Sequence, residues 1–153
     1  MAGSHLAVDF ARHTSRPFIF SASMTPANTV SALAALKHLK AHPELPQKLQ
    51  DISNYARQSF KAHGIPIVES TTPIIPIMTQ TADYTLQLGR NLFDAGVYVN
   101  PVLPPGVPEH ECLLRVSLMA TVTKDLVDEA AQIIATEIGK LQEEESLEYK
   151  KPC

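Results

Sequence analysis

The chain has 153 residues, of which 44% are hydrophobic and 19% are charged, a composition typical of a folded globular domain. Its formal net charge is -3 and its basic residues are spread among acidic ones, so we expect no nucleic-acid partner. No apolar stretch approaches the about 18 residues of a membrane-spanning helix, and no secretion signal is evident. The two cysteines do not have the pattern of a disulfide framework, and we therefore expect a cytoplasmic protein.

The first half of the chain is predicted to be mostly helical. Residues 5–14 are predicted to be the end of a helix, whereas residues 16–20 are expected to form a short strand with a proline at its start. Thr25 is the predicted N-cap of an alanine- and leucine-rich helix over residues 26–39, whose first residue is proline. Residues 46–63 carry apolar side chains at helical spacing and predict a further amphipathic helix.

The second half combines strands with two more helices. One helix is predicted from its N-cap Thr81 to Gly96, and a last amphipathic helix is predicted after Thr123. Pro76 marks its strand as an edge strand or a bulge. Short strands are predicted at residues 65–68, 73–78, 97–100 and 113–118. This order predicts an α+β fold, in which a small mixed or antiparallel sheet has helices packed on one face.

A single arginine, Arg115, lies in the middle of the strand-like apolar run from Cys112 to Met119. Arginine is almost never fully buried unless it is paired, and its planar guanidinium matches a carboxylate with two parallel hydrogen bonds. Arg115 is therefore a candidate anion-binding residue. The alternative is an edge-strand arginine, or one that is paired with an acidic residue of its own chain.

Motifs for other chemistry are missing from the sequence. There is no glycine-rich nucleotide loop and no serine nucleophile elbow. Cys112 has apolar neighbours, among which a thiol behaves as a small hydrophobic group. The six histidines show no metal-ligand spacing, and His110, between Glu109 and Glu111, is expected to belong to a solvated charge cluster. The residues by themselves predict no metal site and no complete active site.

Two segments carry a resemblance to a known enzyme family. Residues 16–27 read R-P-F-I-F-S-A-S-M-T-P-A, and residues 98–123 contain N-P-V, P-P-G-V-P and L-R-V-S-L-M-A. Together they resemble the C-terminal part of the α-oxoamine synthases, with a pattern most like the bacterial serine palmitoyltransferase-like members. These are fold-type I homodimeric enzymes that use pyridoxal 5'-phosphate to join an amino acid to an acyl-CoA with loss of CO2. The resemblance implies the C-terminal small domain of such an enzyme.

The resemblance also implies roles for single residues. Arg115 stands where the family has the arginine that binds the carboxylate of the amino-acid substrate. Ser21 falls in the segment that reaches the cofactor phosphate of the partner subunit, and Ala22 would contribute its backbone N–H there. Two departures limit what is carried over, since Gly106 replaces a threonine of some members and Val122 replaces a histidine of many.

The implied organisation comprises an interface segment and linking helix (residues 1–40), a C-terminal α+β domain (residues 41–145) and a flexible tail (residues 146–153). The family's lysine that binds the cofactor covalently would precede residue 1, so no catalytic residue is expected among these residues. We therefore expect the chain by itself to be inactive.

Three functions stay open at this point. The chain is expected to be part of a decarboxylating acyltransferase that uses serine, glycine or alanine and an acyl-CoA. Alternatively, it is a non-catalytic subunit that dimerises with, or regulates, a catalytic partner. A third reading is a generic α+β domain in which Arg115 binds some other anion.

Overall fold

In the computed structural model, residues 3–20 and 24–148 are described, with side chains up to residue 143. The chain forms two compact units, Met1–Pro43 and Glu44–Cys153. Each is described here by itself.

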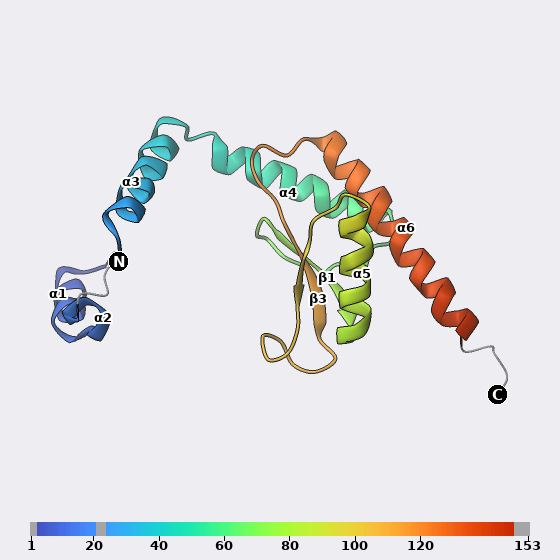
Figure 1. Ribbon diagram of the computed structural model, residues 1–153. Helices are drawn as coiled ribbons and strands as arrows, with labels where there is room; N and C mark the ends of the chain where they lie inside the picture. Colours follow the sequence, from blue (N-terminus) through green and yellow to red (C-terminus); the bar gives the residue numbers. More distant parts are fainter. Residues whose placement is uncertain (1–2, 21–23, 149–153) are drawn as a thin grey trace. The chain divides into compact units, whose positions relative to one another are not determined.

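The N-terminal unit consists of helices in its described part (Figure 1): α1 (His5–Thr14), α2 (Arg16–Ile19) and α3 (Pro26–Ala41). The predicted helix at residues 5–14 is confirmed. The predicted cap of α3 is also confirmed, because the Thr25 hydroxyl accepts a hydrogen bond from the Asn28 N–H at 3.3 Å and proline begins the helix. The predicted strand at residues 16–20 is wrong, since these residues form α2. Pro17 lies in the first turn of α2, where a helix does not use its N–H groups and a proline fits.

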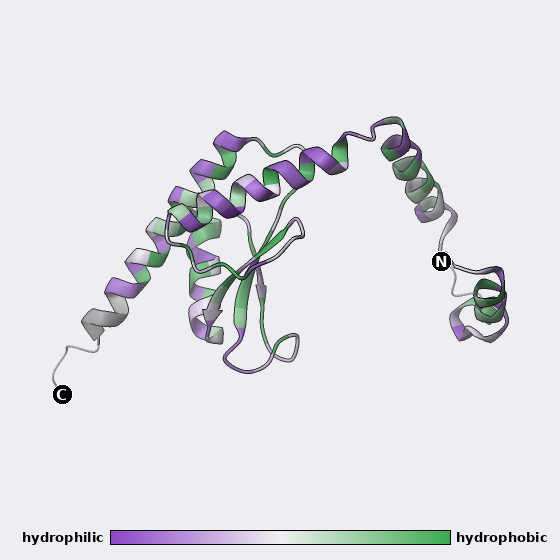
Figure 2. Cartoon of the chain, turned by 180° about the vertical axis from the view of Figure 1, so that it is seen from behind, coloured by the Kyte–Doolittle hydropathy of each residue, from purple (hydrophilic) through white to green (hydrophobic). Residues whose placement is uncertain are grey.

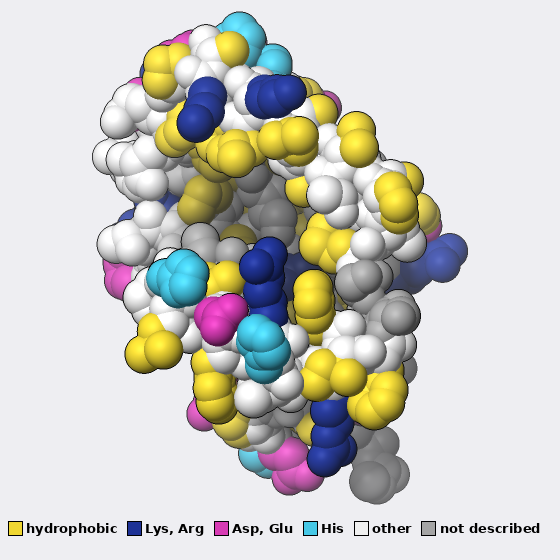
Figure 3. Space-filling view, turned by 90° about the vertical axis from the view of Figure 1, so that its left-hand side faces the viewer, with side chains coloured by type: hydrophobic (Ala, Val, Ile, Leu, Met, Phe, Trp, Pro, Cys, Tyr) yellow, Lys and Arg dark blue, Asp and Glu magenta, His cyan; other side chains and the backbone are white. Residues whose placement is uncertain are grey.

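The surface of the N-terminal unit is strongly apolar. None of its described residues is buried, and hydrophobic side chains are exposed over much of the face seen in Figure 3. The large exposed hydrophobic residues of this unit are Leu6, Phe10, Phe18, Ile19, Phe20, Met24, Val30, Leu33, Leu36 and Leu39. This many large exposed apolar side chains in one unit are typical of an interaction site.

The C-terminal unit is an antiparallel sheet with helices. Its elements are α4 (Leu45–Ala62), β1 (Ile74–Gln80), α5 (Ala82–Asp94), β2 (Asn100–Val102), β3 (Cys112–Ser117) and α6 (Lys124–Glu148). The three strands run in the order β1-β3-β2, and both pairings are antiparallel. The edge position of β1 agrees with Pro76, which cannot donate a backbone hydrogen bond.

Two predicted strands need correction. Residues 65–68 form no strand of their own: they contribute one isolated bridge, Ile67 to Ile77 of β1, with flanking backbone hydrogen bonds. The strand predicted at 97–100 begins only at Asn100, because the antiparallel ladder with β3 starts at the pair Asn100–Arg115. Residues 97–99 lead into the strand after Gly96, whose φ of +91° ends α5 in a conformation that favours glycine.

One face of the sheet is covered by helices. Side chains of a strand alternate between its two faces, and those of β1 and β3 that are fully buried, Ile75, Ile77 and Leu114, share one face. They join a single core with the apolar faces of α4, α5 and α6, and α5 lies along this side of the strands in Figure 1. Figure 2 shows the matching pattern of hydrophobic and hydrophilic residues along α4. The predicted α+β class, with helices on one face, is confirmed.

A buried arginine fixes the loop before β1 to α4. The guanidinium of Arg57, only 8% exposed, donates to the Thr72 carbonyl at 2.8 Å and to Asn54 Oδ1 at 2.6 Å. We expect Arg57→Ala to lower the free energy of unfolding by about 2 kcal/mol, because two hydrogen bonds from a charged donor and the packing of a buried side chain are lost. Urea denaturation measures this. The control is Lys61→Ala, which removes an exposed ion pair with Glu69 and should cost less than about 1 kcal/mol; equal losses for the two variants would refute this role.

A second polar cluster joins α4 to α6. Asp128 accepts hydrogen bonds from the hydroxyls of Tyr55 at 2.6 Å and Ser59 at 2.8 Å, and the Lys124 ammonium lies 4.8 Å from the centre of the Tyr55 ring. The Tyr55 bond, followed by the Ser59 bond, lowers the pKa of the Asp128 carboxyl. The same bond to Asp128 raises the pKa of Tyr55.

Acid is expected to abolish the stability that Asp128 supplies. Since its pKa is lower in the folded than in the unfolded state, the stabilisation is complete above the ordinary value of about 3.9 and is lost as the pH falls through the lowered pKa. The wild type should therefore be more stable than Asp128→Asn at pH 7 and pH 5, with a difference that shrinks below about pH 4. Urea denaturation across this range tests it, and a difference that stays constant down to the lowest pH would contradict it.

Candidate functional site

Arg115 lies at the centre of the sheet face that the helices leave open. β3 is the middle strand, and Arg115 is paired with Pro76 of β1 on one side and with Asn100 of β2 on the other. Its neighbour Leu114 points into the core, so the alternation of the strand places Arg115 on the opposite, open face, where it is exposed. Arg115 is therefore not an edge-strand residue.

The guanidinium of Arg115 has no partner within the described part of the chain. No hydrogen bond or ion pair joins it to any described acidic group, although Asp and Glu residues of this unit form such contacts with Lys61, Arg90 and Lys140. The second alternative for Arg115, an ion pair with its own chain, is thus not found among the described residues. A planar cation with five N–H donors is left available for an external anion.

The surroundings of Arg115 are mostly apolar. By register and alternation, the open face also carries Ile74, Pro76, Met78, Val102 and Leu113. These apolar side chains carry no charge that would compete with Arg115 for an anion.

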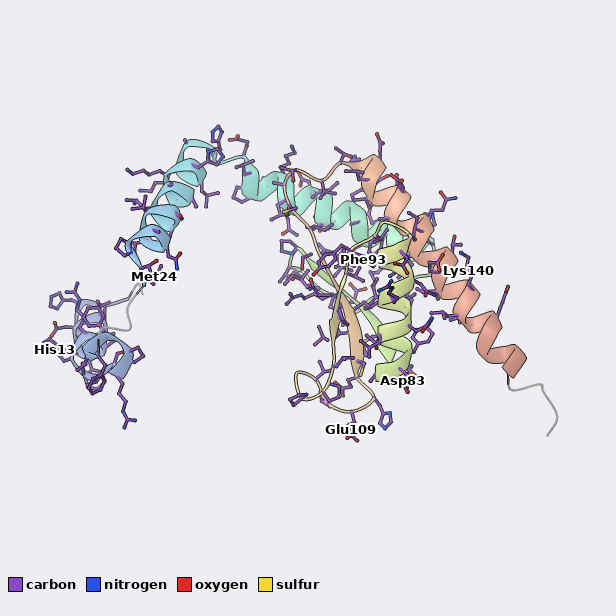
Figure 4. The ribbon with its side chains drawn as sticks, viewed as in Figure 1. His13, Met24, Asp83, Phe93, Glu109 and Lys140 are labelled. Atoms are coloured by element: carbon purple, nitrogen blue, oxygen red, sulfur yellow. The ribbon has the colours of Figure 1, made fainter. Side chains whose placement is uncertain are left out.

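A polar and aromatic group borders this face on the β2 side. Asn100 Nδ2 donates to the Tyr98 hydroxyl at 3.3 Å, and the Tyr98 ring packs edge-on against Phe93, with ring centres 6.5 Å apart. Phe93 lies at the end of α5 (Figure 4). The sequence analysis includes Tyr98 and Asn100 in a segment that carries the resemblance but assigns them no role, because only the strand register brings Asn100 next to Arg115.

The loop between β2 and β3 lies beyond this face. Glu109, His110 and Glu111 are all exposed, as predicted for a solvated charge cluster, and Figure 4 shows Glu109 at the tip of the loop. At Gly106 an added Cβ would lie 3.1 Å from the Leu103 carbonyl oxygen. A threonine, which the resemblance places there in some relatives, would require this loop to shift.

Of the predicted cofactor-binding residues, Ser21 and Ala22 lie outside the described residues. The structure describes α3, whose capped N-terminus at Thr25 follows that segment closely in the chain. The positive end of a helix of this length suits a phosphate group on physical grounds.

A separate cavity of about 370 Å³ lies between the end of β1 and helices α5 and α6. Its lining consists of Pro66, Met78, Thr79, Gln80, Thr81, Tyr84, Leu88, Ile138 and Gln142. Arg115 does not line it, and among the described residues of its lining only Tyr84 is ionisable. The hydroxyls of Thr79 and Thr85 below it are bonded to each other at 2.6 Å. The described lining therefore supplies no positive charge for an anionic substrate.

The remaining candidates for chemistry are Cys112 and the histidines. Cys112 is buried, as its apolar neighbours predicted. The rings of His38 and His42 lie 4.4 Å apart, a proximity that the sequence analysis did not anticipate, but no group of three potential metal ligands occurs within the described ranges. In the same part of the chain, no helix has the length and apolarity to cross a membrane.

Known proteins resemble the chain over most of its length. The family model for aminotransferase class I and II matches residues 1–134. Serine palmitoyltransferase from Bacteroides ovatus is 42% identical over 125 residues, covering 82% of this chain and 32% of that protein. 8-Amino-7-oxononanoate synthase from Thermosipho melanesiensis is 33% identical over 132 residues, covering 86% of this chain and 34% of that protein.

Solved structures support the same relationship. Serine palmitoyltransferase from Sphingomonas wittichii superposes with a TM-score of 0.77 at 25% identity, covering 89% of this chain and 35% of that one. The chain thus spans about a third of the length of the curated relatives it matches. These findings confirm the resemblance to the α-oxoamine synthases that the sequence indicated. The chain belongs to the aminotransferase class I and II family.

Proposed function

We propose that this chain supplies the carboxylate-binding part of a pyridoxal-phosphate-dependent acyltransferase, one that joins serine, glycine or alanine to an acyl-CoA with loss of CO2. The observation that carries the proposal is Arg115, an exposed arginine on the central strand with no partner among the described residues. The 42% identity to a serine palmitoyltransferase supports this reaction class.

In this proposal Arg115 binds and orients the amino-acid substrate. Two parallel N–H donors hold the carboxylate in one plane, which fixes the direction of the bonds at the substrate's α-carbon. The apolar neighbours of Arg115 offer the carboxylate no competing charge. Arg115 transfers no proton, because a guanidinium stays protonated at any physiological pH.

The cofactor would be held partly by the N-terminal unit. Ser21 and the backbone N–H of Ala22 are the proposed contacts to its phosphate, close in sequence to the N-terminus of α3. When bound, pyridoxal phosphate supplies an electron sink for the breaking of bonds at the α-carbon. The residue that holds the cofactor covalently is proposed to lie outside these 153 residues, so that the chain alone is inactive.

The parent enzyme is proposed to be a cytoplasmic homodimer, with residues 1–40 as the interface segment. The support is the exposed apolar surface of the N-terminal unit, which includes Phe10, Phe18 and Phe20 at 55% to 76% exposure. The same surface also favours a second candidate function, a non-catalytic subunit that docks on a catalytic chain.

An assay of CoA release separates the two candidates. The proposed parent enzyme, purified at full length with these 153 residues as part of it, is incubated with palmitoyl-CoA and with serine, glycine or alanine in turn. Release of CoA that requires one of the amino acids is the expected result. No release by the protein alone, together with restored release on addition of a catalytic chain, would overturn the proposal in favour of the second candidate.

A further inference from the structure

Asn100 is the polar residue that the strand register places beside Arg115. The two residues are directly opposite each other in the β2–β3 ladder. Side chains that face each other across an antiparallel pair lie on the same side of the sheet, with Cβ atoms about 5 Å apart. The other direct neighbour of Arg115 in this row is Pro76, which offers no polar side-chain group.

The Asn100 amide is already held in place on one side. One of its two N–H donors is directed to the Tyr98 hydroxyl, 3.3 Å away, and the Tyr98 ring rests edge-on against Phe93. Within the described residues the amide makes no other hydrogen bond, so its second N–H and its oxygen are not used. Asn100 itself is half-buried, so an amide with an unused N–H lies next to a cation.

A carboxylate bound by Arg115 has acceptor capacity to spare. Its two oxygens offer about four lone-pair directions, of which a guanidinium fork occupies two. A donor on the strand beside the arginine, on the same face of the sheet, is suitably placed to bind one of the others.

We propose that Asn100 is the second carboxylate-binding residue of the substrate site, donating a hydrogen bond to the anion that Arg115 holds, with Tyr98 positioning its amide. This inference rests on the proposed function of Arg115. The site would then consist of two hydrogen-bond donors on adjacent strands, Arg115 on β3 and Asn100 on β2. It would select a planar anion whose oxygen has a lone pair directed toward β2.

The test compares a substitution that removes the amide with one that keeps its shape and adds a negative charge. Asn100→Ala removes the donor and should weaken the binding of L-serine, measured by calorimetric titration of the protein as its gene encodes it, by about 10-fold. Asn100→Asp keeps the shape of the side chain but places a carboxylate opposite Arg115, which occupies the guanidinium and repels the substrate. We expect it to weaken serine binding more, by about 100-fold. Tyr98→Phe should cause a smaller loss than Asn100→Ala, because the amide is still present.

Gln132→Glu is the matched control for the added charge, since Gln132 is exposed on α6 and should change serine affinity by less than about twofold. Circular dichroism establishes that each variant is folded. If Arg115→Ala weakens serine binding and both Asn100 variants bind serine as the wild type does, the inference about Asn100 is overturned and the proposed function stands. If Arg115→Ala also binds serine as the wild type does, the proposed function itself fails, and the inference fails with it.

Discussion

Replacement of Arg115 by alanine is expected to weaken binding of the amino-acid substrate by about 100-fold. The loss removes a pair of charge-assisted hydrogen bonds and leaves the substrate carboxylate among apolar side chains such as Met78 and Leu113. Arg115→Lys should lose about 10-fold, because the positive charge stays and the planar fork does not. Calorimetric titration of the protein with L-serine, glycine and L-alanine measures both losses.

Arg90→Ala provides the matched control for this experiment. Arg90 is an exposed arginine on α5 that is paired with Asp94, and its removal should leave the amino-acid affinity unchanged. Equal affinities for the wild type and Arg115→Ala would show that Arg115 is not the carboxylate-binding residue. A loss of the same size in Arg90→Ala would instead indicate a general effect of net charge.

Leu114→Ala is expected to lower the free energy of unfolding by about 3 kcal/mol. Leu114 is fully buried in the middle strand. One of its methyl carbons lies 3.4 Å from the position that a Cβ atom would have at Gly89 of α5, so the strand packs closely on this helix. Truncation to alanine leaves a cavity between the sheet and α5. The cavity stays open because the surrounding side chains are closely packed and relax only partly. Urea denaturation gives the free energy directly.

Leu126→Ala is the control for this substitution. Leu126 lies in the first turn of α6 with 54% of its surface exposed, so its removal should cost less than about 1 kcal/mol. A similarly small loss for Leu114→Ala would mean that the sheet does not pack on α5 as described. Because Leu114 precedes Arg115 on the same strand, a severe loss of packing there is also expected to weaken substrate binding.

The sequence was sufficient to predict the elements with strong local signals. The hydroxyls of Thr25 and Thr123 cap α3 and α6, whereas the predicted cap Thr81 of α5 makes no side-chain hydrogen bond. The four helices α3, α4, α5 and α6 lie close to their predicted bounds. Residues 16–20 were misassigned because apolar residues after a proline are compatible with a strand or with a first helical turn, and local propensity does not decide between them.

The candidate site could be predicted only in part. Arg115 could be identified from the sequence, because an arginine inside an apolar strand is unusual and this signal lies within one short segment. Asn100 was not evident, because its proximity to Arg115 arises from the pairing of two strands that are separated by a proline-containing loop. The residues assigned to the cofactor, Ser21 and Ala22, rest on the family resemblance and are outside the described residues.

The most direct test of the central claim varies the ligand together with Arg115. The affinities of L-serine and of its methyl ester, which lacks the carboxylate, are measured for the wild type and for Arg115→Ala. If Arg115 binds the carboxylate, the wild type prefers serine over the ester by about 100-fold, and this preference disappears in Arg115→Ala. A preference of the same size in both proteins would contradict the account, because the carboxylate would then be recognised by some other group.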